Sequence, residues 1–296
     1  MKAKSLNNPI CHLGEGPLWN VEQQTLYWTD ILEGRLWKYV HETGKISVVW
    51  EGDHKIGGFA FSEDGGIVLC THKGVYKLQK AQLADIHSIP ERIVDIPMAS
   101  TERFNDITTD PKGRIYAGTK FDDNKNGTLY RIEKGKEPVA VLTGLGISNG
   151  MTFSNDLKYF FHTDSVFMCI KRYDYDLNTG NISNPAVFYQ GVKENGFPDG
   201  ITIDTEDHIW VAFWSAGKAR RLNKEGHFVE EIEVDALQPS SVMFGGKEMN
   251  ELFITSACEG GADLKKGLDA KGRFLGGHVY RALTNHKGRP EWPTAL

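Results

Sequence analysis

Cysteine is scarce in this sequence. The chain has 296 residues and only four cysteines, and no two of them have the CxxC spacing of a zinc site or a redox pair. The N-terminus also lacks an apolar stretch long enough for a signal peptide. We therefore expect free, buried thiols in a cytoplasmic protein. The cysteines are Cys11, Cys70, Cys169 and Cys258.

Long hydrophobic runs and basic runs are absent too. No stretch approaches membrane-spanning length. Lys and Arg total 34 against 39 for Asp and Glu, a net charge of −5, which argues against nucleic acid as a partner. The composition, 40% hydrophobic and 25% charged, is normal for a globular protein with a sizeable core. We expect a small-molecule partner, no nucleic acid, no membrane, and a monomer or small homo-oligomer.

Strong helical periodicity is missing, and an internal repeat stands in its place. Each repeat has an apolar strand, a turn cluster and a second apolar strand, as in "EGPLWNVEQQTLYWTD" and "DGITIDTEDHIWVAF", and most have a third strand. Six repeats begin 41 to 50 residues apart, a length typical of propeller blades. We predict an all-β fold, a six-bladed β-propeller forming one domain over residues 1–296. The segment before Glu15 is expected to close the ring with the last blade. A β-sandwich would not predict six near-equal units.

The first residue of each repeat is a candidate for the central channel. Turn clusters such as "SEDGG" and "DTED" lie about five positions later, so the first residue is where the chain enters the innermost strand. Asp199 precedes Gly200, and Asp-Gly favours a turn, but Glu15 has no such preference. Carboxylates and amides meeting at one channel mouth suit a hard divalent cation. The six first residues are Glu15, Gly57, Asn105, Asn149, Asp199 and Ser240.

The sequence resembles the gluconolactonase/regucalcin family of sugar-lactone hydrolases. The blocks "LGEGPLW", "RFNDITTDPKGRIYAGT", "ISNGMTFSND", "PDGITIDTEDHIWVA" and "VMFGGKEMNELFIT" carry the resemblance, which runs in order from about residue 11 to residue 281. It implies a six-bladed propeller with one catalytic divalent metal in the channel. The family's metal ligands fall on Glu15, Asn149 and Asp199, and its substrate-contacting residues on Arg103 and Asn105.

Two departures from the family pattern matter. Gly16 stands where many members have Cys, and this difference should not affect metal binding. The family often has "AGTM" where this chain has "AGTKFDDNKNG". Lys120 and the acidic loop after it are expected to overhang the mouth, so Lys120 is a further candidate for substrate binding. The substrate preference therefore cannot be taken from relatives.

The predicted function is the metal-dependent hydrolysis of a sugar (aldono-) lactone to the sugar acid by a metal-activated water. Asp199 is the candidate general base. The cofactor is one divalent cation, Ca, Mg, Mn or Zn, with calcium slightly favoured. Two alternatives remain open: a non-catalytic calcium-binding regulatory propeller, and an esterase or organophosphatase that uses the same site.

Other signals carry less weight. "GISNG" matches G-x-S-x-G, but the strand pattern "MTFSND" follows it where a nucleophile elbow needs a helix, which argues against Ser148 as a nucleophile. Asp30 and Asp164 end second strands near the mouth, and Asp164 is either a partner of the site or a strand-end cap. Trp19, Trp28 and Trp210 are read as packing between blades. Trp214 is a candidate for the pocket wall.

Overall fold

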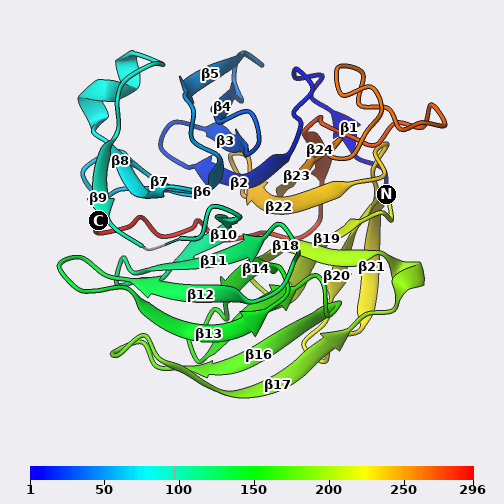
Figure 1. Ribbon diagram of the computed structural model, residues 1–296. Helices are drawn as coiled ribbons and strands as arrows, with labels where there is room; N and C mark the ends of the chain where they lie inside the picture. The colour runs from blue at the N-terminus through cyan, green and yellow to red at the C-terminus, as the bar shows by residue number, and fades with distance from the viewer. Residues whose placement is uncertain (97) are drawn as a thin grey trace.

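The computed structural model describes residues 1–96 and 98–296, and it places six four-stranded sheets around a central channel (Figure 1). In order from the centre outward, the first three blades are β2 (Gly14–Asn20), β3 (Thr25–Asp30), β4 (Arg35–Val40) and β5 (Ile46–Glu51); β6 (Ile56–Phe61), β7 (Ile67–Thr71), β8 (Gly74–Leu78) and β9 (Glu91–Val94); and β10 (Glu102–Thr109), β11 (Ile115–Phe121), β12 (Gly127–Ile132) and β13 (Val139–Leu145).

Blades 4, 5 and 6 complete the ring, which confirms the predicted fold class. They are β14 (Ser148–Phe153), β15 (Tyr159–Asp164), β16 (Cys169–Tyr175) and β17 (Ile182–Gln190); β18 (Phe197–Ile203), β19 (Ile209–Trp214), β20 (Lys218–Leu222) and β21 (Phe228–Glu233); and β22 (Pro239–Gly245), β23 (Glu251–Ser256), β24 (Tyr280–Leu283) and β1 (Lys4–Ser5). The described helices are the short 3₁₀ turns η1 (Lys80–Ala84) and η2 (Lys193–Asn195). No helix in the described part could cross a membrane.

The N-terminal strand closes the ring as predicted. β1 pairs antiparallel with β24, with Lys4 opposite Arg281 and Ser5 opposite Tyr280. The backbone N–H of Ala3 donates to the Glu233 carbonyl at 2.9 Å, so the same segment also joins blade 6 to blade 5. Without β1, the outer edge of β24 would expose unpaired backbone groups.

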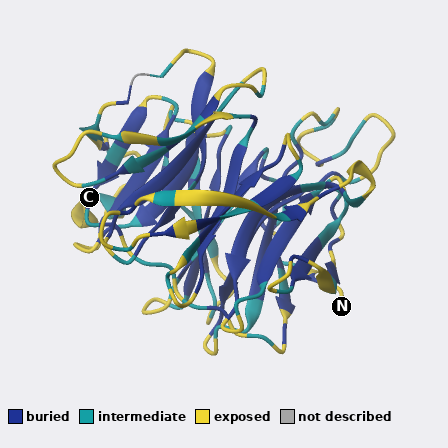
Figure 2. Ribbon diagram, turned by 90° about the horizontal axis from the view of Figure 1, so that it is seen from below, coloured by how far each residue is buried: buried dark blue, intermediate teal, exposed yellow. Residues whose placement is uncertain are grey.

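The hydrophobic core lies between the blades. Six clusters of buried side chains each draw on two neighbouring blades, and Figure 2 shows the inner strands buried while the connecting loops are exposed. Trp19, Trp28 and Trp210 are at most 2% exposed and belong to these clusters, as predicted for packing between blades. Because each blade is held on both sides by apolar contacts, the inner strands form a fixed frame for the channel.

Close packing of inner strands, not a turn, explains two glycines at the channel. A Cβ on Gly57 would lie 2.0 Å from the Phe104 carbonyl oxygen of the next blade. A Cβ on Gly200 would lie 2.0 Å from Ser241 Oγ, again on the next blade. The turn interpretation of the Asp199–Gly200 pair is therefore wrong, since both residues lie inside β18.

The chain after β24 crosses the end of the channel that faces away from the starts of the inner strands. Residues 284–296, red in Figure 1, run past blades 5, 4, 3 and 2 in turn. Thr205 N–H donates to the Lys287 carbonyl at 2.8 Å, and Thr294 N–H donates to the Phe61 carbonyl at 2.8 Å. We call the first residues of the six repeats the ring positions. Beneath them this tail leaves an inner cavity of about 60 Å³, bordered by Glu291 and Trp292.

Removing residues 1–7 is expected to lower the midpoint of thermal unfolding by about 5 °C or more, because β24 loses its partner and Ala3 loses its burial. Differential scanning calorimetry would measure the change. Lys2→Ala is the control. The ion pair between Lys2 and Asp235 is exposed at both side chains, so its loss should change the unfolding midpoint little. An unchanged midpoint in the truncated chain would show that β1 does not hold the ring closed.

Candidate functional site

A cavity of about 350 Å³ opens where the inner strands begin. The side chains that line it come from strands of blades 1, 3, 4 and 5 and from loops, including one in blade 6, so the cavity exists only in the closed ring. All six sequence-predicted site residues line this one cavity, although they are up to 184 positions apart in the chain. They are Glu15, Arg103, Asn105, Lys120, Asn149 and Asp199.

A break in strand pairing lies at the ring position of every blade. The register between the first and second strands shifts between Glu15 and Leu18, between Phe104 and Asp106, and between Asn149 and Met151, with like shifts in blades 2, 5 and 6. A bulge turns a side chain out of the regular alternation and is common at barrel rims and beside active sites. Here the bulges allow the ring residues to face the channel.

The Asn149 side chain has a fixed orientation. The Ser165 hydroxyl donates its one proton to the Pro198 carbonyl at 2.7 Å, so it can only accept from Asn149 Nδ2, which lies 3.0 Å away. The amide nitrogen therefore faces Ser165. Asn149 Oδ1 is buried and has no hydrogen-bond partner in the described structure. Ser165 was not predicted from the sequence, because it follows β15 in a loop outside the repeat pattern.

Two buried carboxylates line the same cavity as that amide oxygen. Glu15 and Asp199 are 4% and 5% exposed, and the pKa of each is raised, first by burial and then by repulsion from neighbouring carboxylates. Glu15 Oε2 accepts only the N–H of Gly16, at 3.0 Å, and Asp199 Oδ1 has no partner among the described residues. Buried oxygens left unpaired are costly, and the unpaired oxygens of Asn149 and Asp199, together with the Glu15 carboxylate in the same cavity, fit a hard divalent cation.

Arg103 and Asn105 form a bonded pair on blade 3. Arg103 Nη1 donates to Asn105 Oδ1 at 2.9 Å and to the Phe104 carbonyl at 2.9 Å. Asn105 Nδ2 donates to the Ser148 carbonyl of blade 4 at 3.0 Å. Asn105 thus connects two blades and holds the guanidinium in place. Burial lowers the pKa of Arg103, which is 8% exposed and lies in the cavity, not in a surface ion pair.

Asp106 is a channel residue that the sequence reasoning missed. Its Oδ1 accepts the N–H of Ile107 at 2.7 Å, and burial raises the pKa of its carboxyl to about 7. It borders the inner cavity beneath the ring, and its charge raises the pKa of both Glu15 and Asp199. The bulge at Asn105 gives two successive residues access to the channel, which strict alternation does not predict.

Several conspicuous polar residues have structural roles. Ser148 Oγ lies 2.7 Å from His162 Nε2, both residues are at most 1% exposed, and Ser148 begins a strand, so it is no nucleophile elbow. Asp30 accepts the N–H groups of His12 and Leu13, and Asp164 accepts four backbone N–H groups, including Gly146 at 2.9 Å. Both are strand-end caps. Trp214 lines the cavity, as the sequence suggested.

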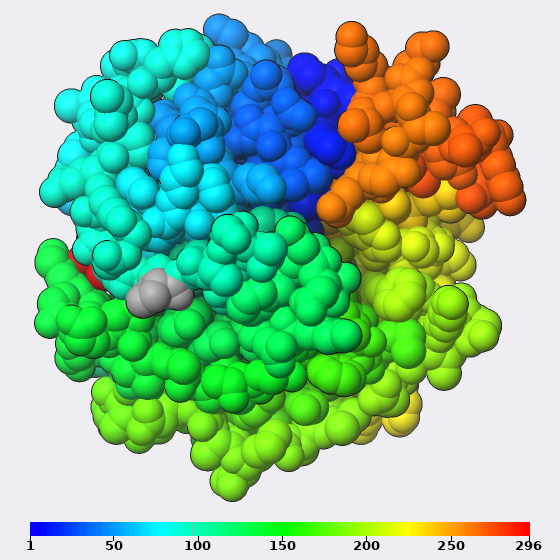
Figure 3. Space-filling view, in the orientation of Figure 1, coloured from blue at the N-terminus to red at the C-terminus, as the bar shows by residue number. Residues whose placement is uncertain are grey.

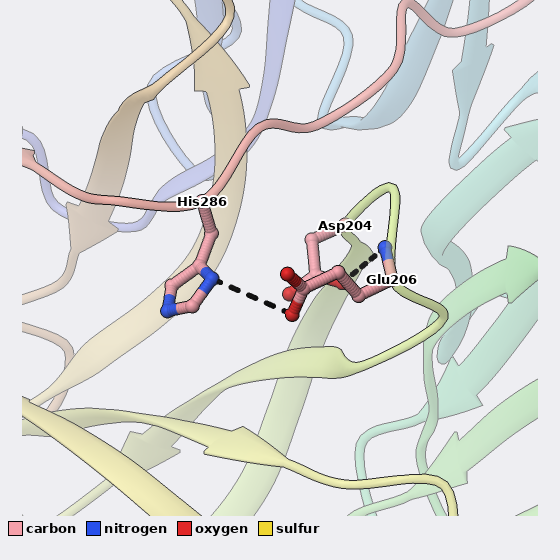
Figure 4. A group of neighbouring side chains, drawn as sticks. All are labelled: Asp204, Glu206 and His286. Atoms are coloured by element: carbon pink, nitrogen blue, oxygen red, sulfur yellow. Dashed lines mark hydrogen bonds and ion pairs between the residues drawn. The ribbon is translucent and has the colours of Figure 1, made fainter.

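A second group with metal-ligand chemistry lies at the far end of the channel. Asp204, Glu206 and His286 lie close together in Figure 4. However, Arg221 Nε donates to Asp204 Oδ2 at 2.8 Å and its Nη2 donates to Glu206, so both carboxylates are already paired with one guanidinium. His286 Nε2 lies 2.9 Å from a fourth side chain, Glu230. This group is an ion-pair network that fastens the C-terminal tail to blade 5.

The fold and the cavity define a six-bladed propeller with an oxygen-rich site at one channel mouth. Residues 13–258 match the family described as SMP-30/Gluconolactonase/LRE-like region, and the chain belongs to this family, as its motifs predict. A pentonolactonase of Haloferax volcanii is 34% identical over 95% of this chain and 94% of its own. A 6-deoxy-6-sulfogluconolactonase of Pseudomonas putida is 34% identical over 83% and 84%. The structure of a luciferin-regenerating enzyme is 29% identical and superposes with a TM-score of 0.88 over 97% of each chain.

The buried carboxylates predict an unusual pH dependence of stability in protein stripped of metal with EDTA. An acid whose pKa rises on folding favours the folded state at low pH, and that advantage is lost as the pH rises through the folded pKa. Stability should therefore fall between about pH 4 and pH 7, the window given for Asp106 by its raised pKa of about 7. Asp106→Asn should raise the unfolding midpoint at pH 8 and change it little at pH 4. Equal effects at both pH values would contradict burial of a charged carboxyl.

Proposed function

We propose that this protein hydrolyses a sugar lactone to the corresponding sugar acid, with a divalent cation held by Glu15, Asn149 and Asp199. One observation carries the proposal. Three oxygen-bearing side chains from three blades line one cavity, and Asn149 Oδ1 and Asp199 Oδ1 are buried without partners. A cation would satisfy both oxygens and remove the repulsion between the two carboxylates.

The names of the two curated relatives support a lactone as the substrate, since both are lactonases. The cavity of about 350 Å³ lies at the small end of the usual range of ligand sites, about 300–1,000 Å³. It suits a compact molecule such as a five- or six-carbon lactone. The polar lining, with donors from Arg103 and Lys120, suits a substrate rich in oxygen.

Hydrolysis of a lactone needs an electrophile, a nucleophilic water and a proton acceptor. A divalent cation, when bound, polarises a carbonyl oxygen and lowers the pKa of water. Asp199 has two carboxylate oxygens, so one can serve the cation while the other accepts the proton of the attacking water. Arg103, held by Asn105, is placed to donate to substrate oxygens away from the reacting carbonyl.

Asp199→Asn should lower kcat by about a hundredfold or more, because the amide cannot accept the proton. Acid release from glucono-1,5-lactone in a pH-stat would measure the rate, with correction for spontaneous hydrolysis. Circular dichroism and the thermal midpoint would establish that the variant is folded. A kcat near that of the wild type would defeat the assignment of Asp199 as general base.

Ser165→Ala should weaken metal binding about tenfold or more, because Asn149 loses the hydrogen bond that points its oxygen into the cavity. Isothermal titration calorimetry with Ca²⁺, Mg²⁺, Mn²⁺ and Zn²⁺ would measure the affinities and identify the preferred ion. Asn149→Ala is the reference for loss of the ligand itself. If Ser165→Ala binds metal like the wild type, the hydroxyl does not position the ligand.

Assays of acid release with and without metal distinguish a metal-dependent enzyme from a protein that only binds metal. Acid release from a panel of five- and six-carbon lactones should stop in EDTA and return when metal is added. Metal binding without metal-dependent release from any lactone would contradict the proposed reaction.

A further inference from the structure

Two positive side chains lie side by side on the blade 3 wall of the cavity. Arg103 in β10 and Lys120 in β11 are directly opposite partners in the antiparallel register, and both line the cavity. Directly opposed like charges destabilise a strand pair. Burial of both groups adds to this cost, and it lowers the pKa of each. Because this arrangement lowers the stability of the folded protein and lies at a cavity, we expect a bound ligand to offset its cost.

Neither cation has a close counter-charge in the part of the chain that the structure describes. No carboxylate lies within 4.0 Å of Arg103 or Lys120, although ion pairs at that distance are numerous elsewhere. Arg103 bonds through Nη1 to a carbonyl and an amide oxygen, which are both neutral. Its Nε and Nη2 make no hydrogen bond to any described residue, so these donors remain available to the cavity.

The charges around this wall do not cancel. A divalent cation would balance Glu15 and Asp199, the two carboxylates proposed to hold it. Arg103 and Lys120 then face one remaining carboxylate that lines the cavity, that of Glu259, and a second one, that of Asp122, which is exposed to solvent. Asp106 borders the separate inner cavity below. Because solvent screens Asp122, the buried lining of the substrate part of the cavity keeps an excess of one positive charge, and a neutral polyol would not offset it.

We propose that Lys120 and Arg103 together bind an anionic group on the substrate, at a distance from the lactone carbonyl, so that the enzyme selects lactones carrying a carboxylate, sulfonate or phosphate. This inference rests on the proposed lactonase function and narrows its substrate class. The guanidinium supplies a planar pair of donors and the ammonium a mobile point charge, and both are suited to acid oxygens. Lys120 is also the residue at which this chain departs from the "AGTM" pattern of its relatives.

The test compares two lactones of one ring size with metal-loaded enzyme. D-Glucono-1,4-lactone is neutral, and D-glucaro-1,4-lactone carries a free carboxylate. The wild type should show at least a tenfold higher kcat/KM for the glucarolactone. Lys120→Met should lower that value chiefly through KM, and about tenfold more than it lowers the value for the gluconolactone. Lys120→Arg should restore the preference. Lys134→Met, which removes the same charge from an exposed turn, is the control for long-range attraction.

Three results would overturn the inference. The wild type could hydrolyse both lactones equally well, Lys120→Met could leave the preference intact, or Lys120→Met could slow both lactones alike. The last result would mean that Lys120 stabilises the negative charge that develops on the lactone oxygen during hydrolysis, since that charge is common to both substrates.

Failure of the proposed function gives a different result. If neither lactone is hydrolysed with any metal, the lactonase proposal fails, and calorimetric binding decides the anion site by itself. D-Glucuronate should then bind the wild type at least tenfold more tightly than D-glucose, and Lys120→Met should remove the difference. Equal binding of the two sugars would overturn the anion site.

Discussion

Repulsion among buried carboxylates is the constraint on which the channel mouth depends. Glu15 and Asp199 are nearly inaccessible to water, and the charge of Asp106 acts on both. Left to relax, such groups would move apart or become protonated. The inner strands cannot move apart, because a hydrophobic cluster fills every space between neighbouring blades and β1 closes the last gap. Packing far from the channel thus keeps an unfavourable set of charges together, ready for a cation.

The sequence predicts the fold and the ring of candidate residues for one physical reason. Each blade repeats the same strand order, so Glu15, Asn149 and Asp199 occupy equivalent places once the repeats are aligned. Their presence in a single cavity follows from symmetry and does not depend on details of side-chain packing. The repeat also placed Asn105 at the channel, whereas Arg103 came from the family motifs, because the repeat alone does not distinguish it from other residues of β10.

Residues outside the repeat could not be found in this way. Asp106 reaches the channel because of a bulge, and a bulge changes the direction of one side chain without leaving a clear mark in the sequence. Ser165 and Glu259 lie in loops after second strands, where the repeat places no pattern. Asp164 has the same residue type as Asp199 yet caps a strand end. Its role became clear only from the four backbone N–H groups that it accepts.

The C-terminal tail affects how small molecules can enter and leave the channel. Residues 284–296 lie across the far end, and Glu291 and Trp292 border the small inner cavity there, which has room for about two water molecules. A propeller channel open at both ends could admit reactant on one side and release product on the other. Figure 3 shows one face of the molecule, with the blades following one another around it in sequence order. Because the tail lies across the far end, in the proposed reaction the product would leave by the mouth at which the reactant enters. On that proposal, accumulated product would compete with the reactant for the same opening.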